Sequence, residues 1–176
     1  LEFVLRDSIG RHWQCGTIQL DFNLPERLGA QYAGKDDEKY APVMIHRALL
    51  GSLERFIGVL IEHYAGNFPL WLAPIQVVLT GISERQNEYV EKVRKRLKDE
   101  GFRVISDTRG ERIKFKIREH SLQKIPVIGV FGDKEVEEET VTVRRFGSNK
   151  TNLMTMDDFI NSLKLEITSR ALPPTL

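Results

Sequence analysis

The first regular pattern in the chain is an alternation of residue types over positions 13–22. A period of two predicts a β-strand, because successive side chains of a strand point to opposite faces of a sheet. The following residues, 24–42, are rich in glycine, proline and charge, which is typical of a loop. The apolar face of the strand comprises Gly16, Ile18, Leu20 and Phe22, and its polar face comprises Cys15, Thr17, Gln19 and Asp21.

A second strand is predicted at 43–50, where His46 shares a face with a methionine and an alanine. A helix follows it, with Ser52 as the N-cap and Gly66 as the C-terminal stop. Its apolar positions have the spacing i, i+3, i+4, i+7, i+8 and i+11, which defines one stripe along the helix. The stripe consists of Leu53, Phe56, Ile57, Leu60, Ile61 and Tyr64.

The pattern changes near Pro74, where we place a boundary between domains 1–74 and 75–176. Short apolar strands then alternate with helices, which predicts a mixed, mostly parallel sheet with helical crossovers. Ser83 and Gln86 have the spacing of a capping box. We therefore expect an α/β fold of the α+β type. Its second-domain strands are predicted at 75–79, 102–107, 125–132 and 140–147, the last at an edge, and the final helix begins at Thr155.

The first 74 residues contain two or three strands and one good helix by these patterns. That is too little to close a core around so polar a strand face, because small units bury a small share of their surface. We therefore expect residues 1–74 to be the C-terminal part of a larger domain, and the chain to be a fragment.

Composition indicates an ordinary soluble protein, with 41% hydrophobic and 29% charged residues among 176. No apolar run could span a bilayer, and the N-terminus lacks the pattern of a signal peptide, so no membrane partner is expected. The single cysteine, Cys15, fits a reducing compartment, either the cytoplasm or an organellar matrix. The net charge of +1 means that any basic surface must be local.

Arg55 lies in the first turn of the predicted helix, off its apolar stripe. A cation there is mildly unfavourable, because a helix N-terminus carries partial positive charge. A bound anion would reverse this, since the guanidinium and the free backbone N–H groups could donate to one phosphate. The alternative is a surface arginine paired with Glu54, Glu62 or Asp21.

His46 is either a satisfied core residue or a metal ligand. A zinc site needs three or four ligands, and the chain has no HxxxH or CxxC spacing. A metal at His46 would therefore need ligands from upstream of this chain. The polar face of the first strand carries neutral hydrogen-bonding groups, which suit a small polar ligand or a solvated sheet face.

Residues 103–124 hold seven basic and three acidic residues, with Phe115 among them. Lysines and arginines that neutralise phosphates beside a stacking ring would suit a nucleic-acid surface. The alternative is a solvated helix with Phe115 in the core. Arg144 and Arg145 add charge on a later strand, and Glu135 could accept from the amino edge of a base.

Four stretches of the chain read "GRHWQCGTIQLDFNLPERL", "PVMIHRALLGSLERFIGVLIEHYAGNFPLWLAP", "FKIREHSLQKIP" and "GDKEVE". They resemble the threonyl-tRNA synthetases of bacterial or organellar type, a family of class II aminoacyl-tRNA synthetases. The second stretch is similar to class II motif 3, a strand–helix unit ending in Gly-x-x-Glu-Arg, and its His-Arg-Ala prefix is specific to the threonine enzymes. The resemblance covers essentially the whole chain. It implies the end of an antiparallel-sheet catalytic domain at 1–74, followed by a small mixed α/β anticodon-binding domain at 75–176.

The resemblance implies a catalytic role for Arg55, as the motif 3 arginine on the phosphates of ATP. It implies that His46 is one of three protein ligands of an active-site Zn²⁺ that binds the amino and hydroxyl groups of threonine. The other two ligands would lie upstream. Positions lining the adenylate and threonine pocket are matched by Gln14, Thr17, Gln19 and Ser52, and positions that read anticodon bases are matched by Arg118, Glu135 and Arg144.

The implied activity is that of a threonine–tRNA ligase, which uses ATP with Mg²⁺, threonine and tRNA(Thr) and works as a homodimer when intact. The fragment is expected to be inactive alone, because motif 1 and most of motif 2 are missing. Gly110 departs from the family pattern, in which asparagine is common there. Two alternatives remain. One is a prolyl-, histidyl- or glycyl-tRNA synthetase, and the other is a non-catalytic nucleic-acid-binding module derived from such an enzyme.

Overall fold

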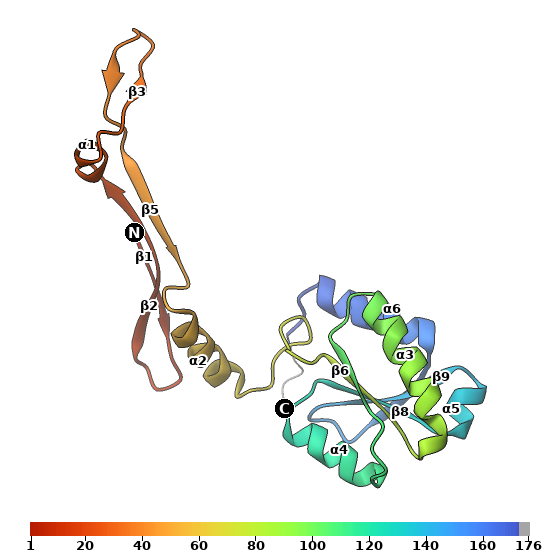
Figure 1. Cartoon of the computed structure of the whole chain (residues 1–176). Coiled ribbons are helices and arrows are strands. Elements are labelled where there is room, and N and C mark those ends of the chain that lie inside the picture. The colour runs from red at the N-terminus through yellow and green to blue at the C-terminus, as the bar shows by residue number, and fades with distance from the viewer. Residues whose placement is uncertain (173–176) are drawn as a thin grey trace. The chain divides into compact units, whose positions relative to one another are not determined.

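The computed structural model describes residues 1–172 and forms two compact units, the first Leu1–Tyr64 and the second starting at Ala65 (Figure 1). The predicted boundary near Pro74 lies beyond this division. The residues just before Pro74 pack with the second unit, since Leu70 is buried in its core and its carbonyl accepts from Gln76 Nε2 at 2.9 Å. No helix in the described part of the chain is long and apolar enough to cross a membrane.

The first unit is built on an antiparallel three-stranded sheet in the order β1-β2-β5. β2 (His12–Asp21) and β5 (Met44–Leu49) confirm the two strands that the alternating patterns predict. β1 (Glu2–Arg6) is a strand that the sequence pattern missed. All five of its residues are exposed, so no contrast between a buried and a solvated face marks it.

Residues 24–42 contain more structure than the predicted loop. They form the short helix α1 (Leu24–Arg27) and a two-stranded hairpin of β3 (Tyr32–Ala33) and β4 (Lys39–Tyr40). The Asp21 carboxylate supports the start of this helix, because it accepts from the backbone N–H groups of Asn23 and Leu24, both at 2.9 Å. These elements depend on local capping and turn contacts, which hydrophobic periodicity does not detect.

The helix α2 (Leu53–Tyr64) confirms the predicted helix after Ser52. The Ser52 hydroxyl accepts from the backbone N–H of Arg55 at 3.4 Å, which is the expected N-cap contact. Within the described residues, no residue of α2 is buried. The apolar stripe is thus half or more exposed at Leu53 and Ile57, and the first unit leaves an apolar helix face uncovered.

The second unit contains a mixed five-stranded sheet in the order β10-β9-β8-β6-β7. β6 pairs in parallel with both β7 and β8, whereas β9 pairs antiparallel with β8 and β10 pairs antiparallel with β9. This confirms the predicted mixed sheet. The prediction of an edge strand at 140–147 was wrong, because a further strand pairs with it. The strands are β6 (Val77–Gly81), β7 (Val104–Asp107), β8 (Val127–Phe131), β9 (Thr140–Arg145) and β10 (Thr151–Thr155).

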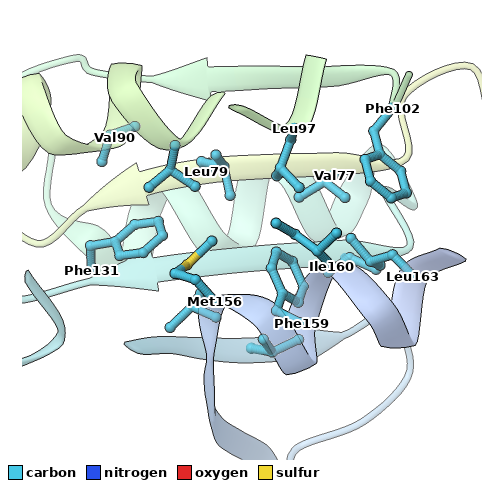
Figure 2. Packing of buried hydrophobic residues seen from close by; sticks show 14 of the residues in the cluster. Val77, Leu79, Val90, Leu97, Phe102, Phe131, Met156, Phe159, Ile160 and Leu163 are labelled. Carbon is cyan, nitrogen blue, oxygen red and sulfur yellow. The ribbon is translucent and has the colours of Figure 1, made fainter. Parts of the chain in front are cut away.

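Helices cover both faces of this sheet (Figure 1). On one face, α3 (Asn87–Asp99) and α6 (Met156–Thr168) enclose the main core, and Figure 2 shows their apolar side chains meeting those of β6. On the other face, α4 (Ile113–Leu122) packs over a smaller cluster. A short helix, α5 (Asp133–Glu137), follows β8. The main core includes Val77, Leu79, Val90, Leu97, Phe131, Phe159, Ile160 and Leu163.

Candidate functional site

In the first unit, the paired strands β2 and β5 bring three of the predicted site residues together. Gln19 lies directly opposite His46, and Thr17 lies opposite Ala48, two positions along the same strands. Cross-strand partners and residues two apart share a sheet face, so Thr17, Gln19 and His46 are neighbours on one face. Gln19 is exposed, and the other two are half-buried. The face carries an amide, a hydroxyl and an imidazole.

The position of Gln14 depends on an irregularity in β2. Phe3 pairs with Gly16 while Val4 pairs with Gln14, so β2 holds one more residue than β1 at this point. Such bulges interrupt the alternation of side chains and re-aim them. Strict alternation would put Gln14 on the face opposite to Thr17, and the bulge removes that constraint. Gln14 is exposed.

His46 is held by a carboxylate on the neighbouring strand. Its Nε2 lies 3.0 Å from Oδ2 of Asp21. The pKa of Asp21 is lowered first by the backbone N–H groups of Leu24 and Asn23, and then by His46. Among residues 1–172 no group contacts the other ring nitrogen of His46, and an imidazole backed by a carboxylate in this way would suit a metal ligand. Residues 1–172 contain no cluster of three or more possible metal ligands.

Arg55 is exposed in the first turn of α2, and its guanidinium carbon lies 5.2 Å from the ring centroid of Trp13. The surface ion pair considered as an alternative is not formed. Glu54 accepts from the Ser52 hydroxyl at 2.8 Å, Glu62 lies 3.9 Å from Arg11, and Asp21 contacts His46. The charged edge of Arg55 is therefore not taken up by any carboxylate in the described chain.

In the second unit, the loops after the three parallel strands are tied to one another. Gln86, which follows β6, donates to Asp133, which follows β8, at 2.5 Å. Asn87 donates to the carbonyl of Thr108, which follows β7, at 3.2 Å. Ligands of open α/β sheets bind outside the carboxyl ends of the strands. These contacts thus connect the loops at the edge of the sheet where a ligand of such a fold would bind.

Glu135 lies at this edge in a fixed orientation. One carboxylate oxygen accepts from the Thr142 hydroxyl at 2.8 Å, and the other accepts from the backbone N–H of Gly132 at 2.9 Å. Burial alone would raise the pKa of Glu135, but the hydrogen bond from Thr142 and the backbone N–H groups outweigh it and lower the pKa. The carboxylate is therefore ionised, and each oxygen keeps a second acceptor position.

Arg144 and Arg118 lie on the side of the sheet that α4 covers. Arg144 pairs with Ile128 across β9 and β8, and Ile128 belongs to the cluster under α4. Thr142, two residues earlier, shares that face and binds Glu135. Arg118 is exposed on α4. Among the described residues, Arg118 contacts neither Glu135 nor Arg144. The three residues therefore lie on one side of the sheet without forming a cluster.

The basic segment 103–124 presents less free charge than the sequence suggests. Lys116 is buried with 2% exposure, and Arg109 is paired with Asp107 at 2.7 Å and with Glu119 at 2.6 Å. In the described part of the chain, the exposed cations of α4 and its N-cap that form no ion pair are Arg112, Lys114 and Arg118. Phe115 is 51% exposed, so the alternative that places it in the core is wrong.

Sequence reasoning missed a buried polar cluster behind this helix. Asp107 accepts from the Arg109 guanidinium and from His120 Nε2 at 2.8 Å, and its backbone carbonyl accepts from Lys116 Nζ at 3.3 Å. The hydrogen bond from Arg109 is the main cause that lowers the pKa of Asp107, and His120 contributes further. The signal in the sequence was the spacing of four between Lys116 and His120, which puts both on one helix face.

Gly110 stands where a side chain would meet a carboxylate. A Cβ placed there would lie 2.8 Å from Oε1 of Glu84, which precedes α3 in the 3₁₀ turn η1 (Glu84–Gln86). Glu84 is exposed and its carboxylate is the end of a flexible side chain, so it could move aside for a larger residue at position 110.

These two units match two known families. The family model described as the anticodon binding domain matches residues 76–166, and the model described as the tRNA synthetase class II core domain (G, H, P, S and T) matches residues 1–64. A strand–helix unit of motif 3 type joined to an anticodon-binding fold defines the class as a class II aminoacyl-tRNA synthetase. Within that class, the chain belongs to the threonyl-tRNA synthetase family, as its C-terminal part.

The relatives agree with this assignment. The threonine–tRNA ligase of Bordetella avium (strain 197N) is 56% identical over 170 residues, and that of Brucella canis is 54% identical over 175 residues. The matches cover 97% and 99% of this chain, but the chain spans only 26% of the length of each relative. A solved structure of the RNA binding domain of threonyl-tRNA synthetase from Cryptosporidium parvum Iowa II has a TM-score of 0.86 and 37% identity. The match covers 99% of this chain and 43% of the chain in that solved structure.

Proposed function

We propose that this chain serves as the C-terminal part of a threonine–tRNA ligase, which activates threonine with ATP and transfers it to tRNA(Thr). Intact, the enzyme would act as a homodimer in the cytoplasm or an organellar matrix. The observation that carries the proposal is Arg55 at the N-terminus of α2, whose guanidinium forms no ion pair with a carboxylate of residues 1–172. His46 and the neutral polar face of β2 lie on the strands of the same unit.

Arg55 would hold the phosphates of ATP. Its planar guanidinium offers five N–H donors, and the first turn of α2 adds free backbone N–H groups and a partial positive charge. Together with the Mg²⁺ that accompanies ATP, these donors would neutralise charge that develops as pyrophosphate leaves. Positioning and charge stabilisation would supply the rate enhancement, so no protein nucleophile is needed.

His46 fits a zinc ligand, because Asp21 engages one ring nitrogen and leaves the other for a metal. The remaining ligands would come from outside the described residues. When bound, Zn²⁺ would supply a Lewis acid that takes the amino and hydroxyl groups of threonine. A site built for a hydroxyl leaves valine poorly paired, which would account for discrimination against it. Gln14, Thr17, Gln19 and Ser52 would line the adenylate and threonine pocket with neutral hydrogen-bonding groups.

The second unit would read the anticodon. Glu135 keeps acceptor positions that suit the amino group of a base, while Arg118 and Arg144 offer donors to bases or phosphates. Sequence-specific recognition of RNA favours unpaired bases, and an anticodon loop supplies them. The anchoring of Glu135 by two donors means that little ordering is required when a base binds.

The test uses a full-length synthetase that carries this chain as its C-terminal part. In Arg55→Ala, threonine-dependent ATP–pyrophosphate exchange should fall by about 100-fold or more, since a donor to developing charge is lost, while zinc content stays at the wild-type level. In His46→Ala, zinc measured by mass spectrometry and threonine-dependent exchange should be lost together. Retained exchange in Arg55→Ala would remove the phosphate role, and unchanged zinc in His46→Ala would remove the metal role.

A further inference from the structure

Trp13 sits at the centre of a charged arrangement at the start of β2. The guanidinium carbons of Arg55 and Arg11 each lie 5.2 Å from its ring centroid. Both distances are within the range of a cation–π contact, which is strongest for tryptophan. Trp13 itself is only partly exposed. The ring therefore offers Arg55 a surface that is already fixed by its surroundings.

A buried carboxylate fixes the ring. Asp7 accepts from the indole Nε1 of Trp13 at 2.9 Å and from the Nε of Arg11 at 2.6 Å. The same carboxylate also accepts from the backbone N–H groups of Ile9 and Arg11 at the turn between β1 and β2. Burial would raise the pKa of Asp7, but these hydrogen bonds, led by that of Trp13, hold it well below its usual range. The charged carboxylate thus joins the turn, the indole and Arg11 into one unit.

Asp7 also neutralises Arg11. Of the two guanidinium groups over Trp13, that of Arg55 is therefore the one without a carboxylate partner in the described part of the chain. The way Arg55 is held matters for binding phosphate. An ion pair would orient the side chain but occupy its N–H donors, which a phosphate would have to displace. A stacked ring contacts the face of the guanidinium and leaves the N–H edge open.

We propose that Trp13 is a positioning residue for Arg55, and that Asp7 locks Trp13 in the required orientation. The proposal rests on the proposed role of Arg55 in binding the phosphates of ATP. Trp13 acts through Arg55 and need not touch the nucleotide. The pre-orientation reduces the side-chain freedom that Arg55 loses when ATP binds.

The experiment measures threonine-dependent pyrophosphate exchange in the full-length enzyme at varied ATP and at varied threonine. Trp13→Leu removes the ring, and we expect a loss of about three- to thirtyfold in kcat/KM for ATP, from the strength of exposed to desolvated cation–π contacts. The KM for threonine should stay the same. Trp13→Phe keeps an aromatic face but loses the N–H donor to Asp7, and it should restore part of the loss. The matched control is Trp71→Leu, which removes the other tryptophan that lies under a guanidinium in this chain.

A double-mutant cycle separates positioning from general damage. In an Arg55→Ala background, Trp13→Leu should cause no further loss, because the group that it positions is gone. Additive losses, or equal effects on ATP and threonine, would overturn the positioning role while leaving Arg55 in place. If Arg55→Ala alone leaves exchange unchanged, the proposed function itself fails, and that outcome is distinct from the others.

Discussion

Buried carboxylates organise both units at the level of single residues. Asp7 and Asp107 each lie in a turn or at a strand end and gather donors from side chains close in sequence. A buried carboxylate is stable only when its acceptor positions are satisfied, so each one fixes the groups around it. Asp7 fixes the ring beside Arg55, and Asp107 fixes the start of the loop that precedes α4. The ring that Asp7 fixes lies beside Arg55, a predicted site residue.

The lowered pKa of Asp107 makes an acid-stability prediction. Its ordinary pKa is 3.8, and its pKa in the folded protein is lower, so its stabilising contribution is complete above the ordinary value and is lost as the pH falls below it. From about pH 5 downward, the free energy of unfolding should fall more steeply in the wild type than in Asp107→Asn. Urea unfolding followed at several pH values checks this. Equal slopes in the two proteins would contradict it.

At the level of elements, the sequence predicted helix starts well because their chemistry is local. The pair Ser83 and Gln86 and the N-cap Thr155 lie where helical structure begins. Strands depend on partners far along the chain, and here prediction was weaker. β10 is exposed at nearly every position, so its residue pattern did not predict a strand that pairs with β9. Lys116 was predicted to be a surface charge, because no local pattern indicates that its ammonium group donates to the backbone carbonyl of Asp107.

Thr155 gives a test of local capping. Its hydroxyl accepts from the backbone N–H of Asp158 at 3.2 Å at the start of α6. Thr155→Ala should lower the free energy of unfolding by about 1 kcal/mol, since a free N–H group loses its acceptor. Thr155→Ser, which keeps the hydroxyl, should remain close to the wild type. Thermal or urea unfolding followed by circular dichroism measures both, and equal losses in the two variants would rule out the capping role.

At the scale of the whole molecule, the proposed binding functions are divided between the two units. The residues assigned to ATP, zinc and threonine lie in the first unit, and those assigned to the anticodon lie in the second. From the sequence, the family resemblance assigned the proposed roles of His46 and Arg55, whereas periodicity alone left both open. The residues that support them, Asp21 and Trp13, could not be assigned, because their contacts cross between strands or between a strand and a helix. The uncovered apolar face of α2 agrees with the first unit's expected dependence on further residues.

The measurement that tests the central claim most directly compares two reactions of the full-length enzyme carrying Arg144→Ala. The account predicts that charging of tRNA(Thr) falls by about tenfold or more, as for the loss of one base contact, while threonine-dependent pyrophosphate exchange is unchanged. Arg145→Ala is the matched control, because Arg145 pairs with Glu166 at 2.8 Å on the opposite sheet face, and it should leave charging near the wild-type level. Unchanged charging in Arg144→Ala, or a parallel loss of exchange, would contradict the account.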